Sequence, residues 1–326
     1  MTKEKEKVTD PLELAYAAIE KEYGKGAIIT SGISFPEVER ILSGSLALDK
    51  ALNGGWARGR IIEIFGPEST GKTTVALHAI AQAQKANLKC VFIDAEHALD
   101  GIYAKDLGVD LDQLIFCQPD NGEMALNITE TLIRSGKVGL IVIDSVAALA
   151  PRAEIEGDIG DSHMGLQARM MSQALRKFSG IVKKTNTTII FINQLRSKIG
   201  IVWGNPSVTT GGNALKFYAS QRIEVKRVES IKSGEEIIAN KVRVKVVKSK
   251  VGRPFRIAEF QIGFGKGIDS TVEIFNLAKD LKIINKAGSW YDFNGERWQG
   301  EATVLNALET NPTLLEDIKG LVDAGM

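Results

Sequence analysis

The residues with the clearest chemical meaning form the run Gly-Pro-Glu-Ser-Thr-Gly-Lys-Thr at positions 66–73. This run matches the phosphate-loop pattern G-x-x-x-x-G-K-[ST], whose glycines let backbone N–H groups wrap around phosphate oxygens. Lys72 then contacts the β- and γ-phosphates, and the hydroxyl of Thr73 is a ligand for Mg²⁺. A strand is expected before the run and a helix after it, with the positive helix end facing the phosphates. The sequence therefore predicts a site for ATP and Mg²⁺ rather than a glycine-rich surface turn.

Carboxylates for the metal and for the attacking water are expected at the ends of other apolar runs. Asp144 ends the run LIVID, where a carboxylate that holds a magnesium-bound water is expected. An aspartate at a strand end is commonplace, so this interpretation depends on the phosphate loop. Asp94 and Glu96 are two residues apart and point the same way in a continuing strand, so spacing does not choose between them. The amide of Gln194 can bind the γ-phosphate or the attacking water, and the loop after it can respond to the nucleotide.

A candidate polymer-binding loop covers residues 195–212, which contain Arg196 and Lys198 and no acidic residue. The loop also carries apolar side chains, among them Ile199 and Trp203. Cations for phosphates, together with apolar or aromatic groups for bases, suit single-stranded nucleic acid. A disordered surface loop is the alternative, because loops of this length in a compact domain are either functional or disordered.

A second loop is expected at residues 153–165, which hold four acidic residues and no basic one. Its charge argues against contact with DNA. The helix expected after it places Arg169 and Arg176 two turns apart on one face, while its methionines are expected to pack in the core.

Four apolar, β-branched runs are expected to position these groups. They are almost continuously hydrophobic, as strands buried on both faces of a parallel sheet are, and helical stretches separate them. The runs cover residues 60–65, 90–94, 140–144 and 188–193. This alternation predicts an α/β fold with a doubly wound, mostly parallel sheet. In such a sheet the ligand crevice lies outside the carboxyl ends of the strands, so the phosphate loop and the acidic groups should converge there.

The flanks of this core differ from it. Asp10 can cap an N-terminal helix with Pro11 in its first turn and Gly24 after its end, and the apolar face of that helix must pack on something. After about residue 270 the pattern indicates a small α+β domain. The predicted organisation is an N-terminal helix and strand arm at 1–33, the core with both loops at 34–269, and the C-terminal domain at 270–326.

Residues 222–262 alternate with period two around a polar turn, which predicts antiparallel strands that extend the sheet. Within them, residues 241–256 carry seven basic side chains and no acidic one. Basic side chains on an edge strand can simply prevent aggregation, and this interpretation is favoured over phosphate contacts by Lys248 and Lys250.

Composition excludes several classes of protein. A chain of 326 residues with 44% hydrophobic and 25% charged residues is typical of a globular protein with one large and one small domain. Its net charge is only +1, so any affinity for nucleic acid must come from local patches. The two cysteines indicate no disulfide framework or metal site, and no run is apolar enough for a membrane span or a signal peptide. We expect a cytoplasmic protein that does not bind a membrane.

Several longer stretches resemble bacterial RecA recombinases, and the similarity runs from the N-terminal helix through the small C-terminal domain. The stretches are GPESTGKTT (66–74), FIDAEHALD (92–100), IVIDSVAAL (141–149), EIEGDIGDSHMGLQARMMSQALRKF (154–178), FINQLRSKIG (191–200) and TTGGNALKFYAS (209–220). They are long and specific, so the resemblance goes beyond a shared phosphate loop.

The resemblance implies roles that spacing left open. Glu96 would activate the water, and Gln194 would sense the γ-phosphate. Lys248 and Lys250 would act on nucleotide phosphates across a subunit interface, against the edge-strand interpretation. The remaining implied nucleotide contacts are Gly66, Pro67, Glu68, Ser69, Thr70, Gly71, Lys72, Thr73 and Thr74 at the phosphates, Asp100 and Tyr103 at adenine, and Phe264 and Gly265 from the neighbouring subunit.

The resemblance also implies that both loops line a DNA groove, and Arg196 is predicted as a DNA contact from the charge of its loop. Phosphate contacts are implied for Arg169, Ser172, Arg176, Gly211, Gly212 and Asn213, and apolar wedges between base triplets for Met164 and Ile199. The N-terminal helix and a strand around Ile28 would pack on the next protomer, which would cover the apolar face of the helix.

Three departures from the best-known members of the family stand out. Trp203 and Phe264 occupy positions where those members have Phe and Tyr, so stacking should survive but a phenolic hydrogen bond at 264 would be absent. The printed chain ends at Met326, where many members continue into a strongly acidic tail. Residues 301–326 hold five acids and one lysine. We therefore expect this end of the chain to repel duplex DNA only weakly, so that duplex DNA reaches the filament more easily.

The sequence thus predicts a DNA-dependent ATPase that forms helical filaments on single-stranded DNA and exchanges strands with homologous duplex DNA. The resemblance further implies co-activation of LexA-type repressor self-cleavage in the SOS response. A closed-ring helicase or clock-type ATPase and a non-enzymatic DNA-binding scaffold are the alternatives. Closed hexamers in electron micrographs would indicate the ring, and loss of turnover with retained DNA binding in Glu96→Gln would argue against the scaffold.

Overall fold

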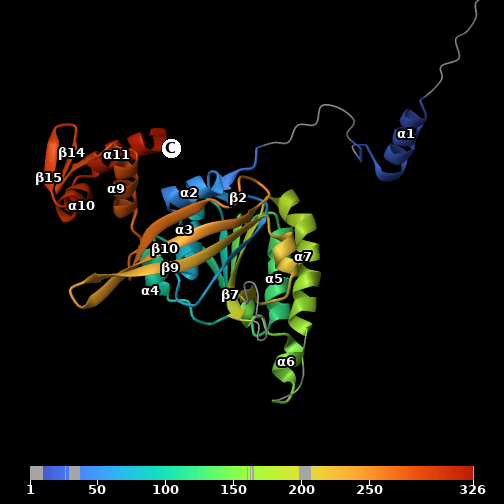
Figure 1. Ribbon diagram of the computed structural model, residues 1–326. Helices are drawn as coiled ribbons and strands as arrows, with labels where there is room; N and C mark the ends of the chain where they lie inside the picture. Colours follow the sequence, from blue (N-terminus) through green and yellow to red (C-terminus); the bar gives the residue numbers. More distant parts are fainter. Residues whose placement is uncertain are drawn as a thin grey trace, which may run out of the picture. The chain divides into compact units, whose positions relative to one another are not determined.

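The computed structural model describes residues 10–25, 27–28, 37–159, 161, 163, 165–197 and 207–325 (Figure 1). The chain divides into two compact units, residues 1–38 and residues 39–326, and each is described by itself. Among the described residues, no helix is both long enough and apolar enough to span a membrane.

The first unit contains the predicted helix, α1 (Pro11–Tyr23). Asp10 caps it by accepting a hydrogen bond from the Leu12 N–H at 2.9 Å, and Gly24 ends it with a φ of 94°. No residue of α1 is buried, so its apolar face remains uncovered within this unit. Ile28 lies in a bend rather than in the predicted strand, because a strand needs a partner and the described part of this unit offers none.

The second unit is built on the predicted mostly parallel sheet, whose order is β12-β11-β10-β9-β3-β7-β6-β4-β5. Every pair from β9 through β5 is parallel, and the pairs at the other end are antiparallel. The parallel strands are β9 (Gln221–Ser233), β3 (Ile61–Gly66), β7 (Thr188–Ser197), β6 (Leu140–Asp144), β4 (Cys90–Asp94) and β5 (Leu114–Cys117). The antiparallel extension is β10 (Glu236–Ser249), β11 (Ile257–Gly263) and β12 (Gly267–Ile268). The fold class predicted from the strand pattern is confirmed.

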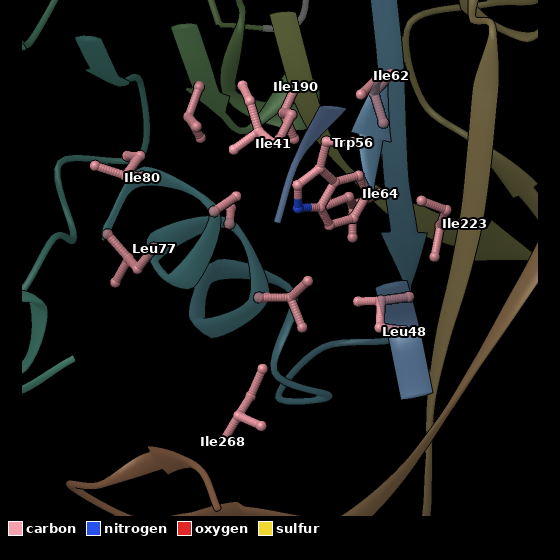
Figure 2. Close-up of a cluster of buried hydrophobic side chains, with 14 of the residues drawn as sticks. Ile41, Leu48, Trp56, Ile62, Ile64, Leu77, Ile80, Ile190, Ile223 and Ile268 are labelled. Atoms are coloured by element: carbon pink, nitrogen blue, oxygen red, sulfur yellow. The ribbon is translucent and has the colours of Figure 1, made fainter. Parts of the chain in front are cut away.

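Helices cover both faces of this sheet, as expected of a doubly wound fold. One face packs on α3 (Lys72–Lys85), where Leu77 and Ile80 lie among sheet residues such as Ile62 and Ile190 (Figure 2). The other face packs on α5 (Gly122–Arg134), α7 (Leu166–Thr185) and the short α8 (Ala214–Tyr218). The remaining short elements of the core are β1 (Arg40–Ile41), α2 (Leu46–Leu52), β2 (Trp56–Ala57), α4 (Gly101–Asp106), a 3₁₀ turn (Val146–Ala148), α6 (Arg152–Glu156) and β8 (Ser207–Thr209).

The C-terminal region has its own apolar cluster, which includes Phe275, Tyr291 and Ile318. It consists of α9 (Ser270–Asp280), β13 (Asn285–Ala287), β14 (Trp290–Phe293), β15 (Glu296–Gln299), α10 (Glu301–Thr310) and α11 (Pro312–Gly325). These elements match the predicted mixture of helices and a small aromatic strand region. The boundaries at 33/34 and 269/270 remain predictions.

Both predicted loops are shorter than the sequence pattern indicated. The strand β7 continues through Ser197, and β8 pairs antiparallel with it, Leu195 opposite Thr209. Hydrogen bonds from the returning chain therefore keep residues 195–197 in a strand, which a polar, glycine-containing composition could not show. Residues 152–156 similarly form α6 rather than the start of a loop. Met164, Lys198, Ile199 and Trp203 lie outside the described residues.

Candidate functional site

A cavity of about 330 Å³ lies at the carboxyl ends of the parallel strands. It collects residues from four separate segments, as the strand pattern predicted. The lining residues are Glu68, Ser69, Lys72, Thr73, Glu96, Asp144, Ser145, Ile192 and Gln194. The structure thus brings together side chains that are up to 126 positions apart in the sequence, from Glu68 to Gln194.

The phosphate loop has a tightly constrained backbone. A Cβ atom at Gly66 would lie 2.1 Å from the Val225 carbonyl oxygen, so no larger residue fits there. Gly71 has a φ of 88°, in the left-handed region that glycine adopts readily. The hydroxyl of Thr70 donates to the Pro67 carbonyl at 2.9 Å and braces the loop from within. Thr74, at the start of α3, completes the set of predicted loop residues.

The loop also directs positive charge toward the cavity. The helix α3 begins at Lys72, and the N–H groups of a first helical turn have no partner inside the helix. The Lys72 Nζ donates to the Pro67 carbonyl at 2.6 Å, and burial lowers the pKa of Lys72 while Asp144, Glu96 and Glu68 oppose that shift. An ammonium, free N–H groups and a helix dipole together suit a polyphosphate.

Thr73 and Asp144 face each other across the cavity. The Thr73 hydroxyl donates to Asp144 Oδ2 at 2.7 Å. Asp144 is only 7% exposed, and burial raises its pKa to about 6, a shift that Glu96 and Asp94 increase and that Thr73 and Lys72 oppose. Two hard oxygen donors beside a phosphate loop fit Mg²⁺, which takes few ligands from protein and keeps the rest for water and phosphate.

The structure separates Asp94 from Glu96. Asp94 is buried and accepts hydrogen bonds from the N–H groups of Ala98 and Leu99, both at 3.2 Å, so it holds the turn after β4. Glu96 instead lines the cavity. Its Oε1 accepts a hydrogen bond from the Ser145 hydroxyl and another from Gln194 Nε2 at 2.9 Å. The two carboxylates therefore do not point the same way, because β4 ends at Asp94 and the chain turns.

The residues predicted around the adenine lie outside this cavity. Asp100 caps α4 by accepting from the N–H groups of Ile102 at 2.8 Å and Tyr103 at 3.1 Å. The Tyr103 hydroxyl lies 2.9 Å from Thr74 Oγ1, which ties α4 to the helix of the phosphate loop. Phe264, in the turn between β11 and β12, is 54% exposed, and Gly265 follows it with a φ of 73°. Phe264 is therefore free to contact another molecule.

Lys248 and Lys250, the lysines predicted at the subunit interface, lie together at the end of β10. Lys248 Nζ donates to the carbonyls of Lys216 at 2.5 Å and Phe217 at 3.0 Å, and Lys250 Nζ donates to the Phe217 carbonyl at 3.1 Å. Both ammonium groups therefore sit at the C-terminal end of α8, where the helix dipole favours cations. Burial lowers the pKa of Lys248, and the neighbouring charges of Lys250 and Arg222 add to that effect.

Several predicted DNA contacts lie on α7 or against it. Arg169 and Arg176 are exposed on it, and Ser172 donates to the Ala168 carbonyl at 2.7 Å. Gly212 has a φ of 79°, and a Cβ atom on it would lie 2.7 Å from Ala168 Cβ. A Cβ atom on Gly211 would lie 2.6 Å from Val146 Cγ1 and 3.5 Å from Met171 Cγ, the latter on α7. The chain segment of the two glycines thus lies against α7.

Two other predicted contacts border this region. Asn213 precedes α8 and accepts from Lys216 Nζ at 3.3 Å. Arg196 is exposed and lines a second cavity together with Glu154, Gln167 and Thr210. Met164 and Ile199, the predicted wedges, are outside the described residues.

The two family models that match this chain together cover almost all of it. The RecA N-terminal domain model matches residues 10–269, and the RecA C-terminal domain model matches residues 272–326. This chain belongs to the RecA family.

Relatives from three bacteria, each named Protein RecA, agree with this assignment. The relative from Bacteroides thetaiotaomicron is 58% identical over 314 residues, which are 95% of this chain and 95% of the relative. The relative from Oceanobacillus iheyensis is 56% identical over 310 residues, 94% of this chain and 89% of the relative. The relative from Rhodospirillum rubrum is 54% identical over 317 residues, 96% of this chain and 87% of the relative.

The sequence pattern assigned no role to four polar residues of this RecA-family chain that support the site. Ser145 binds Glu96, and Asn193 contacts both Gln194 and Thr210. The buried Glu63 and the half-buried Arg222 form an ion pair next to Asn193. One signal was available: Glu63 is a charged residue inside the otherwise apolar stretch IIEIF (61–65), and such a residue must be paired when it is buried.

Proposed function

We propose that this RecA-family chain is a DNA-dependent ATPase that assembles with ATP and Mg²⁺ into a helical filament on single-stranded DNA. The filament pairs that strand with homologous duplex DNA and exchanges strands, in DNA recombination and repair. One observation carries the proposal. Glu96, which reaches the nucleotide cavity, is hydrogen-bonded to Gln194, and Gln194 lies on β7, the strand that leads directly into the predicted polymer-binding segment.

The residues of the cavity have distinct tasks in hydrolysis. The loop N–H groups and Lys72 bind the β- and γ-phosphates and stabilise the charge that develops on them. Thr73 and Asp144 would hold Mg²⁺, which neutralises phosphate charge when it is bound. Glu96 accepts a hydrogen bond from the attacking water and takes up its proton. Ser145 and Gln194 orient the Glu96 carboxylate.

Activation across a subunit interface explains why hydrolysis would occur only in the filament. Lys248 and Lys250 would donate to phosphates of the neighbouring subunit's nucleotide, in place of the α8 carbonyls that they contact in the free chain. Phe264 and Gly265 would approach the adenine that Asp100 and Tyr103 hold. An open, heterologous interface of this kind generates a helical polymer. The uncovered apolar face of α1 would pack on the next protomer.

The DNA-binding surface would combine electrostatic and steric contacts. Arg169, Arg176 and Arg196 would neutralise phosphates, and the N–H groups of Gly211 and Gly212 would approach the backbone closely. The other proposed contacts are Ser172 and Asn213 at phosphates and Met164 and Ile199 as wedges. Each subunit would hold few nucleotides, and the filament would bind tightly because its sites are linked.

The decisive experiment measures ATP hydrolysis with and without single-stranded DNA, beside Lys72→Ala as a control. We expect strong stimulation by DNA that the Lys72→Ala variant lacks. Exchange between circular single strands and homologous linear duplex, followed by gel electrophoresis, tests the recombinase activity itself. Hydrolysis that is independent of DNA, or closed hexamers in electron micrographs, would contradict the proposal and favour a ring motor.

We also propose that the filament promotes self-cleavage of a LexA-type repressor and that the chain acts in the cytoplasm. Family membership supports the first proposal, and two unpaired cysteines, Cys90 and Cys117, agree with a reducing compartment. Incubation of such a repressor with protein, ATP and single-stranded DNA should yield two repressor fragments. An intact repressor under conditions that support strand exchange would contradict this second activity.

A further inference from the structure

Glu63 is a fully buried carboxylate in β3, three residues before the phosphate loop. A buried charge is tolerated only when it is paired and hydrogen-bonded. Glu63 meets both conditions, because its Oε2 accepts from Arg222 Nε at 2.5 Å and its Oε1 accepts from Asn193 Nδ2 at 2.9 Å. The proposed hydrolysis mechanism assigns no role to this group.

The partner Asn193 is also fully buried, and its amide uses every hydrogen-bonding position. Its Nδ2 donates to Glu63 and to the Thr210 carbonyl at 3.2 Å. Its Oδ1 accepts from the Gln194 N–H at 2.9 Å and from the Thr210 hydroxyl at 2.6 Å. Asn193 therefore links Gln194, which binds Glu96, to Thr210, which precedes Gly211 and Gly212.

The Glu63 carboxylate determines which way this amide points. A carboxylate can only accept hydrogen bonds, so it requires the Nδ2 side of Asn193 to face it. A flipped amide would place Oδ1 against Glu63 and against the Thr210 carbonyl, and the Gln194 N–H would lose its acceptor. Glu63 thus maintains the hydrogen bonds of both Gln194 and Thr210.

Arg222 extends the same network toward the interface lysines. It lies opposite Glu63 in the pairing of β3 with β9, and its guanidinium lies 4.7 Å from the centre of the Phe65 ring. On its other side Arg222 is opposite Lys248 in the pairing of β9 with β10. The Glu63–Arg222 ion pair and Asn193 therefore connect β3 with β9 and β7, and Arg222 lies beside β10, the strand of Lys248.

We propose that Glu63 is a positioning residue that couples the nucleotide site to the DNA-binding segment. It holds the Asn193 amide so that a change at Gln194 is transmitted to Thr210, and a change at Thr210 to Gln194. This inference rests on the proposed DNA-dependent ATPase. It adds a residue that contacts neither nucleotide nor DNA and yet determines how strongly the two affect each other.

The test compares wild type with Glu63→Gln, a variant of the same shape that can also donate. The measurement is the affinity for fluorescent single-stranded DNA in a non-hydrolysable ATP analogue divided by that in ADP. We expect this ratio to fall about tenfold in Glu63→Gln, because coupling between sites commonly spans this range. The stimulation of ATP hydrolysis by DNA should fall with it, because Gln194, which Asn193 contacts, is hydrogen-bonded to Glu96.

Matched controls separate coupling from loss of structure. Glu273→Gln changes another buried glutamate in the same way, one whose hydrogen bonds go to residues 45–47 and not to this network, and it should leave the ratio unchanged. If Glu63→Gln does not fold, Thr210→Val removes one hydrogen bond to Asn193 and should lower the ratio, whereas Thr210→Ser should preserve it. In the double variant Glu63→Gln/Thr210→Val the two effects should not add.

The possible outcomes are distinct. A wild-type ratio near one would overturn the proposed function and this inference with it. A high wild-type ratio that persists in folded Glu63→Gln, or in Thr210→Val where Glu63→Gln does not fold, would overturn the inference and leave the proposed function intact. A purely structural role of Glu63 would weaken binding equally in both nucleotides, with no change in the ratio, and would also overturn it.

Discussion

The hydroxyl of Thr73, at the start of α3, donates a hydrogen bond across 2.7 Å to Asp144, at the end of β6. The pair is the proposed Mg²⁺ site, and burial raises the pKa of Asp144 to about 6. A carboxyl group must lose its proton to bind the metal.

The affinity for Mg²⁺ should therefore depend on pH around the pKa of Asp144. As pH falls from 7.5 to 5, Asp144 becomes protonated, and the Mg²⁺ concentration needed for half-maximal ATP hydrolysis should rise about tenfold. The Asp144→Asn variant should need high Mg²⁺ at both pH values. Equal Mg²⁺ requirements of the wild type at pH 5 and 7.5 would count against Asp144 as a ligand.

The lysine pair at the end of β10 leads to a prediction about mixed filaments. Lys248→Ala and Glu96→Gln should each lose at least about a hundredfold of DNA-stimulated hydrolysis, because each removes a group that acts on the phosphates or the water. An equimolar mixture should be more active than either variant, since a Glu96→Gln subunit supplies Lys248 to a neighbour that has Glu96. The check is steady-state ATP turnover, and a mixture no better than the average would indicate that Lys248 acts within its own subunit.

Gly212 should tolerate alanine poorly for two reasons. Its φ of 79° disfavours any residue with a Cβ atom, and that atom would lie 2.7 Å from Ala168 Cβ. Gly136 has a φ of 65° with nothing near its Cβ position, so Gly136→Ala should cost only about 1–2 kcal/mol of backbone energy.

Gly212→Ala should also weaken binding of single-stranded DNA about tenfold, measured by fluorescence anisotropy. Normal DNA affinity in Gly212→Ala would argue against close approach of DNA to this segment.

Glu273 gives the stability of the protein a specific dependence on pH. It lies on α9, and its carboxylate accepts from the N–H groups of Leu46 at 3.0 Å and Ala47 at 3.1 Å and from the Ser45 hydroxyl. Burial raises its pKa from 4.5 to about 7, and the nearby Asp49 adds to the shift. Between these two values the folded protein retains a proton that the unfolded chain has lost, so stability should decrease as pH rises from 4.5 to 7.

Comparison with Glu273→Gln isolates this contribution. The free energy of unfolding of wild type, relative to that of the variant, should decrease by about 3 kcal/mol between pH 4.5 and pH 7. Urea denaturation at several pH values measures the difference. A difference that does not change with pH would mean that Glu273 titrates alike in the folded and unfolded chain.

The sequence alone determined the features that depend on short-range patterns. Four continuous apolar runs indicated buried parallel strands, because only strands covered on both faces are hydrophobic throughout. The spacing of Gly66, Gly71, Lys72 and Thr73 identified the phosphate loop, since that chemistry requires these residues within eight positions. The general rule that ligands bind at the carboxyl ends of parallel strands then located the cavity.

Tertiary structure decided the contacts between residues far apart in the chain. Asp94 and Glu96 could not be told apart by spacing, because the direction of Glu96 depends on where β4 ends and on Ser145 and Gln194 beside it. The lysines at 248 and 250 meet α8 only because β10 pairs with β9, and β9 with β3.

The ion pair of Glu63 with Arg222 depends on the same strand order. Its two residues are 159 positions apart, and Asn193 is 130 positions from Glu63. A local sequence pattern shows how side chains alternate along a strand, but it does not show which strand lies next to it in the sheet. Packing of the whole core decides which strand lies beside which, and that packing places Glu63 between the proposed nucleotide site and the proposed DNA-binding segment.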